Sequence, residues 1–328
     1  MNFAYAMRLA CLSLAMLFLV NFTATTLVLS FSRHVTHAAR TMQPRRAARM
    51  FLRLRMLPFV LSLCTVFALC IPSYLRYEEN TGVEKVGLFC LAMGALGLSL
   101  CVTSAYRTAR ACVQLYCVEQ RCRQLLRVQF STLSGKPMCL ASEEESEMPL
   151  LALVGIVHPT RIVSRRLLDV LSAEQIEAAL SHEDAHEVSR DNLKRMLFGL
   201  TPGILPFVSG FAGIEQNWEK YSELAADDYA ASGRAGRSVA LAEALIQVAR
   251  LGNRECNFRF ASSLSVRSLD LAARVDRLLA AQPAGRHEAS NSKVSLRFCI
   301  VAAALLAVLL LLPKLMTSLY PLLESLLH

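Results

Sequence analysis

The stretch ALSHEDAHEVSRDNL, residues 179–193, places two histidines four residues apart, with a glutamate directly after the first. Helix residues separated by four lie on the same face, so the imidazoles of His182 and His186 can reach one ion. Glu183 completes the H-E-x-x-H pattern, in which two histidines bind zinc and the glutamate acts as a general base on the water of the metal. The pattern therefore predicts a zinc site built on His182 and His186.

The residues before this pattern predict its secondary structure. Ser172 is a favourable N-cap and Gln175 completes a capping box, which predicts a helix from Ala173 to about Leu197. Upstream, MPLLALVGIVHPTRIV, residues 148–163, is rich in apolar and β-branched residues around one glycine and one internal proline. This composition predicts one or two short strands.

A second polar segment can complete the metal site. A catalytic zinc needs a third protein ligand, with the fourth position left for water or substrate. In KYSELAADDYAA, residues 220–231, two acids are separated by four on a segment with strong helix propensity. We expect Glu223 to bind the metal and Asp227 to accept a hydrogen bond from a ligating imidazole. A solvated acidic helix face is the alternative interpretation, and the histidine pair makes it the weaker one.

The rest of the chain is too apolar for an ordinary soluble protein. Of its 328 residues, 54% are hydrophobic and the mean hydropathy is +0.39. Uncharged runs over residues 9–32, 56–75 and 86–106 each reach the length of about 20 residues that a helix needs to cross hydrocarbon. A fourth span and a short extracytoplasmic tail are expected within residues 298–328. We predict an α-helical polytopic membrane protein of about four transmembrane helices, with an α+β domain, residues 107–297, inserted between the third and fourth.

The positions of the arginines predict the orientation, because cytoplasmic loops are enriched in Lys and Arg near the spans. Arginines cluster after the first and third spans, at Arg33, Arg40, Arg45, Arg46, Arg49, Arg53, Arg55, Arg107, Arg110, Arg121, Arg123 and Arg127. We expect both termini to be extracytoplasmic and residues 107–297 to be cytoplasmic. A cleavable signal peptide is disfavoured because only Arg8 precedes the first apolar run. Membrane topology also accounts for the net charge of +9, so the expected partner is the bilayer and not nucleic acid.

An uncharged run, MLFGLTPGILPFVSGFAGI, residues 196–214, separates the two halves of the predicted site. Its two prolines and four glycines favour a broken element. We predict a re-entrant or membrane-surface hairpin that returns the chain to the same side. The alternative, a single crossing of the membrane, would place His182 and Glu223 on opposite sides and prevent a shared site.

The motifs resemble those of a known family. HEDAHEVSRDN followed by ELAAD is similar to the gluzincin arrangement of the BlaR/MecR-type membrane metallopeptidases and, more distantly, of HtpX-type and prenyl-protease-type enzymes. The likeness includes LLDVLSAEQIEAALSHE and the order of three spans before and one after the polar domain. It implies a zinc endopeptidase of the bacterial inner membrane. It also implies the site residues: the zinc ligands His182, His186 and Glu223, the catalytic base Glu183, and Asp227 as the partner of a ligand.

The same resemblance implies a place in signal transduction. The expected substrate is a cytoplasmic DNA-binding repressor, as for an antirepressor, or the chain itself. We expect no penicillin-binding sensor domain after the last span. Asp184 stands where the family often has an apolar residue, and we expect it on a wet face or paired with Arg190 or another basic side chain.

Two further expectations concern the binding of the substrate, and the first of them rests on fold analogy. The strand near LLALVGIV is expected to pair with an extended substrate along its edge. An additional oxyanion donor is expected among four candidates, namely Tyr221, Tyr229, Arg267 and Arg274.

A second hypothesis comes from another functional class. A catalytically silent signalling or scaffold protein could hold a structural zinc, which normally has four protein ligands. Glu183 argues against this hypothesis, because a closed structural site has no use for a base at that position. A transporter or channel is disfavoured because the spans contain almost no ionisable residues.

Overall fold

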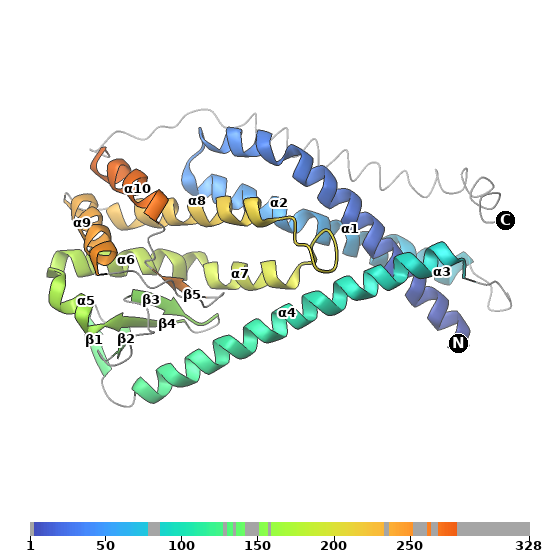
Figure 1. The fold of residues 1–328 in the computed structure, drawn as a ribbon, viewed down its shortest axis with the longest axis horizontal. Helices are drawn as coiled ribbons and strands as arrows, with labels where there is room; N and C mark the ends of the chain where they lie inside the picture. The colour runs from blue at the N-terminus through green and yellow to red at the C-terminus, as the bar shows by residue number, and fades with distance from the viewer. Residues whose placement is uncertain are drawn as a thin grey trace.

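Long helices form one end of the molecule, and a small sheet with covering helices forms the other (Figure 1). The structure is a computed structural model. It describes residues 3–77, 86–126, 130–133, 136–141, 151–156, 159–232, 236–251, 261–263 and 268–280.

Among the described residues, three helical stretches are long and apolar enough to cross a membrane. The first is α1 (Phe3–Ala39) and the third is α4 (Leu88–Leu126). The second is continuous through α2 (Pro44–Thr65), the π-helical η1 (Val66–Cys70) and α3 (Ile71–Tyr77). The first two stretches contain the spans predicted over residues 9–32 and 56–75, and α4 covers the third, predicted over residues 86–106, from residue 88 onward. The three stretches identify a membrane protein. The predicted fourth span, residues 298–328, lies outside the described residues.

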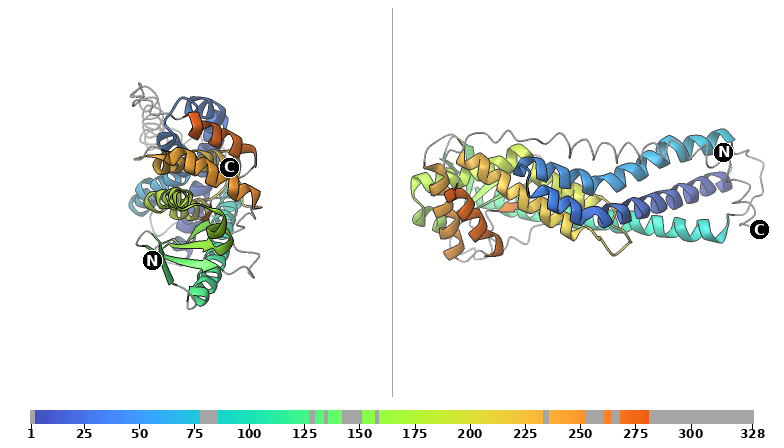
Figure 2. Two further views of the ribbon diagram at one scale, coloured as in Figure 1. Left: turned by 90° about the vertical axis from the view of Figure 1, so that its left-hand side faces the viewer. Right: turned by 90° about the horizontal axis from the view of Figure 1, so that it is seen from above.

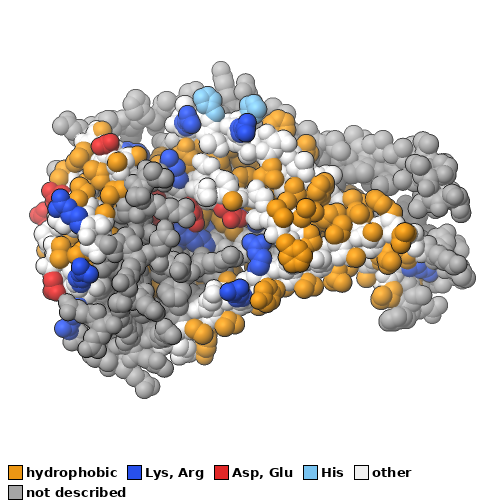
Figure 3. Space-filling view, viewed as in Figure 1, with side chains coloured by type: hydrophobic (Ala, Val, Ile, Leu, Met, Phe, Trp, Pro, Cys, Tyr) orange, Lys and Arg blue, Asp and Glu red, His pale blue; other side chains and the backbone are white. Residues whose placement is uncertain are grey.

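The membrane helices expose apolar side chains where they leave the rest of the molecule. Figure 3 shows hydrophobic side chains gathered over this end, and Figure 2 shows the three stretches running side by side away from the sheet. On α4, Leu88 is 82% exposed and Phe89 is 64% exposed. Exposed apolar surface of this extent fits a lipid environment better than water.

Five strands form one mixed sheet in the order β1-β2-β4-β3-β5. β2 and β4 are parallel, and the other neighbours are antiparallel. The strands are β1 (Phe130–Leu133), β2 (Lys136–Ala141), β3 (Leu151–Val154), β4 (Thr160–Ser164) and β5 (Ala261–Ser263). β3 and β4 confirm the strands predicted within residues 148–163.

The predicted use of β3 as a substrate edge is wrong for this arrangement. β3 lies between β4 and β5, and residues 152–154 pair with all three residues of β5. The free edges of the described sheet belong to β1 and β5. An extended substrate could reach β3 only by displacing β5, because both edges of β3 already have partners. No local pattern in the sequence indicated that a segment so far downstream would occupy this edge.

Six helices complete the part of the chain that the structure describes. They are α5 (Arg165–Val170), α6 (Ala173–Ser189), α7 (Asp191–Leu200), α8 (Ala212–Ala231), α9 (Arg237–Arg250) and α10 (Ser268–Ala280). α6 lies between the sheet on one side and α8 and α9 on the other (Figure 1). A buried apolar cluster, which includes Leu241 and Leu245 of α9 and Leu167 of α5, packs this region together.

A second cluster joins the membrane helices to α7 and α8. Phe51 of α2 stacks on Tyr221 of α8 with ring centroids 5.7 Å apart, and Phe198 of α7 packs edge-on against Trp218 of α8 at 5.0 Å. All four side chains are buried. α8 is therefore fixed at its first half to the membrane helices and at its second half to α6.

The predicted long helix is two helices. The capping box is confirmed, because the Ser172 hydroxyl accepts from the Gln175 N–H and the Gln175 side chain accepts from the Ser172 N–H. The helix, however, ends at Ser189, and the expectation that it continues to about Leu197 is wrong. Arg190 adopts a left-handed conformation with φ 54°, which breaks the helix, and α7 then begins at Asp191.

Residues 201–211 turn the chain back between α7 and α8. At the turn the Leu205 and Val208 backbones exchange hydrogen bonds, and Phe207 is 89% exposed at its tip. The side chain of Asn21, in the middle of the first predicted span, donates to the Gly203 carbonyl at 2.8 Å. The apolar run thus does not separate His182 from Glu223. Its position in a bilayer, like the insertion of residues 107–297 as a domain, stays a prediction.

Candidate metal centre

Two facing helices bring the three predicted ligands together. His182 and His186 project from α6, and Glu223 projects from α8. The Nε2 atoms of the histidines are 3.3 Å apart. Glu223 places Oε2 3.3 Å from His182 Nε2 and Oε1 3.4 Å from His186 Nε2. Among the described residues, these three form the one group of His, Cys, Asp or Glu side chains arranged to hold a metal ion.

A buried carboxylate lies at the other nitrogen of each imidazole. His186 Nδ1 donates to Asp191 Oδ2 at 2.7 Å, because an ionised carboxylate can only accept. His182 Nδ1 lies 3.0 Å from Asp227 Oδ1, in an ion-pair contact that is less well aligned than a regular hydrogen bond. Both contacts place the ring proton on Nδ1. The Nε2 lone pair of each histidine therefore faces Glu223 and the other histidine.

This arrangement fits a divalent cation. When both imidazoles are neutral, their Nε2 lone pairs and the carboxylate around one point repel one another unless a cation lies between them. In a tetrahedral zinc site with bonds of about 2.0–2.1 Å, neighbouring ligand atoms are about 3.3–3.4 Å apart. The three separations between His182, His186 and Glu223 are 3.3, 3.3 and 3.4 Å. The donor set, two imidazoles and one carboxylate, is one that catalytic zinc uses.

The surrounding charges shift the pKa values of these groups in opposite directions. Burial lowers the pKa of His182, but its contacts with Asp227 and Glu223 outweigh burial and raise it to about 9. Burial raises the pKa of Glu223, yet the nearby histidines and Arg274 lower it to about 2. The pKa values of Asp191 and Asp227 are also held well below the usual range by their cationic partners, against the effect of burial. All three carboxylates are therefore ionised near neutral pH.

Arg274 of α10 neutralises the excess of carboxylates around the site. Its Nε and Nη2 donate to the two oxygens of Asp227 at 2.8 and 2.7 Å, and its Nη1 lies 3.2 Å from Glu223 Oε2. The guanidinium is buried, with a relative exposure of 4%. Such a bidentate pair fixes both the position and the charge of Asp227. Arg274 thus orients the carboxylates, whereas it was expected only as one of four candidate oxyanion donors.

Asp191 is held just as firmly from three sides. Besides His186, it accepts from the Ser222 hydroxyl at 2.7 Å and from Lys194 Nζ at 2.7 Å. The left-handed turn at Arg190 makes this contact possible, because it places Asp191 at the start of a new helix beside the preceding turn of α6. The helix break therefore belongs to the construction of the site.

Glu183, the predicted base, is fully buried on α6 beside the ligand His182. The candidate oxyanion donors other than Arg274 are not placed among the metal ligands. Tyr221 stacks on Phe51 in the apolar cluster, and Tyr229 is 48% exposed. Arg267 lies outside the described residues.

Two further contacts anchor the metal helices to the sheet. Arg161 of β4, with a relative exposure of 4%, pairs with Asp184 and with Glu187 of α6. Asp184 thus pairs with a basic side chain, as expected, and this partner is Arg161. Asn192 of α7 donates to the carbonyls of Leu153 and Gly155 at 2.9 Å.

Sequence reasoning missed the roles of Asp191, Ser222, Arg274 and Arg161. Asp191 was visible as part of the RDN segment after the motif, and its role as a histidine partner could have been inferred from the general need of zinc histidines for such acceptors. Ser222, Arg274 and Arg161 carried no signal, because their contacts depend on how distant segments pack.

Comparison with known proteins adds one partial match. No protein-family model matches the chain. A segment of 50 residues is 44% identical to a protein named "Protease HtpX homolog" from Archaeoglobus fulgidus, and it covers 15% of this chain and 15% of that protein. Such a short match shows likeness of one segment, and the resemblance to the BlaR/MecR type remains a separate prediction. The chain is therefore a membrane protein that is similar, over one segment, to a protease homolog of the HtpX type.

Proposed function

We propose that the protein is a membrane-embedded, zinc-dependent endopeptidase. One observation carries the proposal: three donor atoms from His182, His186 and Glu223 lie 3.3–3.4 Å apart, with each imidazole oriented by a buried carboxylate. The short match to a protease homolog supports the same reaction class. Zinc bound here would supply a Lewis acid that acidifies water and polarises a peptide carbonyl.

The protein's own residues divide the remaining work. Asp227 and Asp191 keep the Nδ1 protons in place, so that both Nε2 lone pairs stay available for the metal. Arg274 keeps Asp227 and Glu223 ionised and in position. Glu183 accepts a proton from the attacking water and then donates it to the leaving nitrogen.

A structural zinc site is the weaker alternative. Structural zinc normally has four protein ligands, and the donor group has three members within the described part of the chain. The carboxylates closest to these ligands, Asp191 and Asp227, contact the Nδ1 side of the imidazoles, away from the donor triangle. A position for water or substrate therefore remains beside His182, His186 and Glu223.

The substrate class follows from the proposed topology. We propose a cytoplasmic or membrane-proximal protein, with a DNA-binding repressor and the chain itself as the first two candidates, in a signalling role. The motif resemblance supports this choice. Comparing protein N-termini in cells with wild-type or Glu183→Gln protein would identify the substrate, because its new N-terminus would appear only with the wild type.

The reaction itself is tested with purified full-length protein. We expect Glu183→Gln to bind zinc in a 1:1 ratio and to lose at least about a hundredfold in peptide cleavage, the usual contribution of a general base. Glu174→Gln is the matched control, because Glu174 is exposed on the same helix. Unchanged cleavage by Glu183→Gln, or wild-type protein without stoichiometric zinc, would contradict the proposal.

The proposed orientation places the metal domain in the cytoplasm and both termini outside, in a bacterial inner membrane. Native thiols can test it, because Cys112 and Cys117 are exposed on α4 beyond the predicted third span. A membrane-impermeant thiol reagent should label them only after cells are permeabilised. Equal labelling of both residues in intact cells would reverse the orientation.

A further inference from the structure

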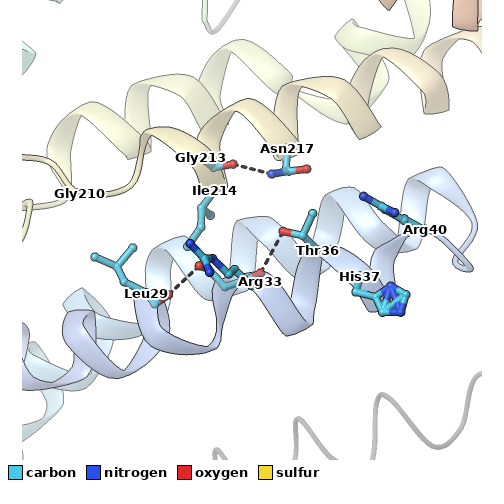
Figure 4. Close-up of a pocket in the computed structure, with 10 residues that line it drawn as sticks. Leu29, Arg33, Thr36, His37, Arg40, Gly210, Gly213, Ile214 and Asn217 are labelled. Carbon is cyan, nitrogen blue, oxygen red and sulfur yellow. Dashed lines mark hydrogen bonds between the residues drawn. The ribbon is translucent and has the colours of Figure 1, made fainter.

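An open groove separates α1 from the first turns of α8, and the metal centre does not use it. Its volume is about 430 Å³. Figure 4 shows Arg33 and Arg40 extending on the side of α1 nearer α8, with Gly213, Ile214 and Asn217 on the opposite wall. The groove lies where the apolar run of α1 ends, since Arg33 is the first charged residue after Arg8.

The cations in this groove have no ion-pair partner in the part of the chain that the structure describes. Among the described residues, no carboxylate forms an ion pair with Arg33 or Arg40. This contrasts with Arg55, which follows in the same basic segment and pairs with Glu215 at 2.7 Å. The first turn of α8 has no side-chain cap, and its one acidic residue, Glu215, is the partner of Arg55 and does not pair with the arginines of the groove. The groove therefore favours an anion.

Apolar side chains line the other end of the groove. Leu29 and Ile214 lie toward the membrane part of α1, and the backbone of Gly210 lies so close to Leu29 that a Cβ added there would be 3.1 Å from Leu29 Cδ1. Thr36 and Asn217 lie with the arginines toward the aqueous end. The lining of the groove thus changes from apolar to cationic along α1, which is the order in which a lipid presents its acyl chains and an anionic headgroup.

We propose that this groove binds the headgroup of an anionic phospholipid from the surrounding bilayer. The phosphate lies between Arg33 and Arg40 near the start of α8, and the glycerol and first acyl carbons lie against Leu29 and Ile214. Free phosphate shares the anionic chemistry but lacks the apolar part, so it satisfies only one end of the groove. Because α8 also carries Glu223, a bound lipid would stabilise the helix that presents a proposed metal ligand.

Charge removal provides the first test. Full-length protein in detergent is titrated with phosphatidylglycerol or phosphatidylcholine of equal chain length, and bound lipid is counted by native mass spectrometry. We expect wild type to prefer phosphatidylglycerol. Arg33→Gln/Arg40→Gln should weaken this binding roughly 25-fold, about fivefold per arginine near an anionic headgroup. The matched control is Arg45→Gln/Arg46→Gln, because these exposed arginines carry equal charge outside the groove and should leave the affinity within about twofold.

Filling the groove without changing its charge provides the second test. A Cβ at Gly213 meets no other atom within 4 Å, so Gly213→Leu should fold normally while its side chain occupies the space of the lipid. We expect this variant to keep or slightly raise its thermal midpoint, because leucine also favours a helix over glycine, and to lose at least tenfold in phosphatidylglycerol affinity. A normal affinity in Gly213→Leu would overturn the proposed location.

The remaining outcomes are equally decisive. Equal affinities for phosphatidylcholine and phosphatidylglycerol would contradict the proposal that the groove selects an anionic headgroup. Equal losses in Arg33→Gln/Arg40→Gln and Arg45→Gln/Arg46→Gln would show general surface attraction in place of a defined site. Inorganic phosphate that displaces the lipid at a similar concentration would assign the groove to free phosphate. None of these results depends on peptidase activity, so the lipid site can fail while the proposed function stands.

Discussion

Charged side chains at the two ends of α8 differ in burial and in ion pairing. Near its C-terminal end, Asp227 and Glu223 contact a histidine and Arg274 in a network that is buried except for part of Glu223, whose side chain is 18% exposed. Beside its N-terminal end, Arg33 and Arg40 line an open groove without an ion-pair partner among the described residues. Buried charges are costly unless paired, whereas exposed charges remain solvated. The metal end is therefore a fixed network that loses stability when one member is removed, and the groove end is a surface that tolerates change.

The largest expected effect comes from removing the buried charge of Asp227. Asp227→Asn leaves Arg274 buried without its bidentate partner and weakens the contact with His182. We expect the free energy of unfolding to fall by about 3–5 kcal/mol, as for other broken buried pairs. Its neighbour Asp228 is the matched control, because the side chain of Asp228 is 48% exposed in its ion pair with Arg277. Asp228→Asn should cost less than about 1 kcal/mol. Similar thermal midpoints for the two variants would contradict the difference between the buried pair and the more exposed pair.

The next effect is a pH dependence that the metal should abolish. The pKa of His182 is raised to about 9, above the ordinary 6.5, so its stabilising contribution is complete below pH 6.5 and disappears as the pH rises through 9. In metal-free protein we expect a loss on the order of 3 kcal/mol across this window. Zinc requires a neutral imidazole, so zinc-loaded protein should lack this loss. Thermal midpoints of chelator-treated and zinc-loaded protein between pH 6 and 9.5 provide the measurement. Parallel curves of thermal midpoint against pH for the two samples would contradict the idea that His182 binds either a proton or zinc.

The sequence predicted those parts of the site that depend on spacing within one helix. The capping box at Ser172, the histidine pair and the spacing of Glu223 and Asp227 are local patterns, and the geometry of one helix converts them into position. The three apolar stretches were equally visible, because span length is set by the thickness of the bilayer.

The parts that sequence could not supply depend on distant segments. Arg274 lies 47 residues beyond Asp227, and β5 covers β3 from more than a hundred residues downstream. No local periodicity records such contacts. The break at Arg190 was also hidden, because a non-glycine residue with positive φ is uncommon and the helical pattern continues through it. The same break places Asp191 against His186. The position at which the helical pattern failed to predict the structure is therefore next to a residue of the site.

A smaller effect is expected from weakening the orientation of one histidine. Asp191→Asn keeps an acceptor for His186 but removes the negative charge that Lys194 and Ser222 hold in place. We expect zinc affinity to fall about 10–100-fold, the usual effect of changing such a partner, with the fold retained. Competition with a zinc-binding dye would measure the affinity. Asp169→Asn, at an exposed position of α5, should leave it unchanged.

The smallest effect tests the open end of α8. A Cβ at Gly213 meets nothing within 4 Å, and alanine costs less conformational entropy than glycine in a helix. Gly213→Ala should therefore raise the free energy of unfolding by up to about 1 kcal/mol. Toward the other end of α8, Ala226 is 2% exposed. Ala226→Val should therefore lower the free energy of unfolding by about 1–3 kcal/mol through overpacking. Thermal midpoints of both variants decide the matter. A destabilised Gly213→Ala would mean that the groove is already filled by protein, which would remove both the contrast along α8 and the room for a lipid.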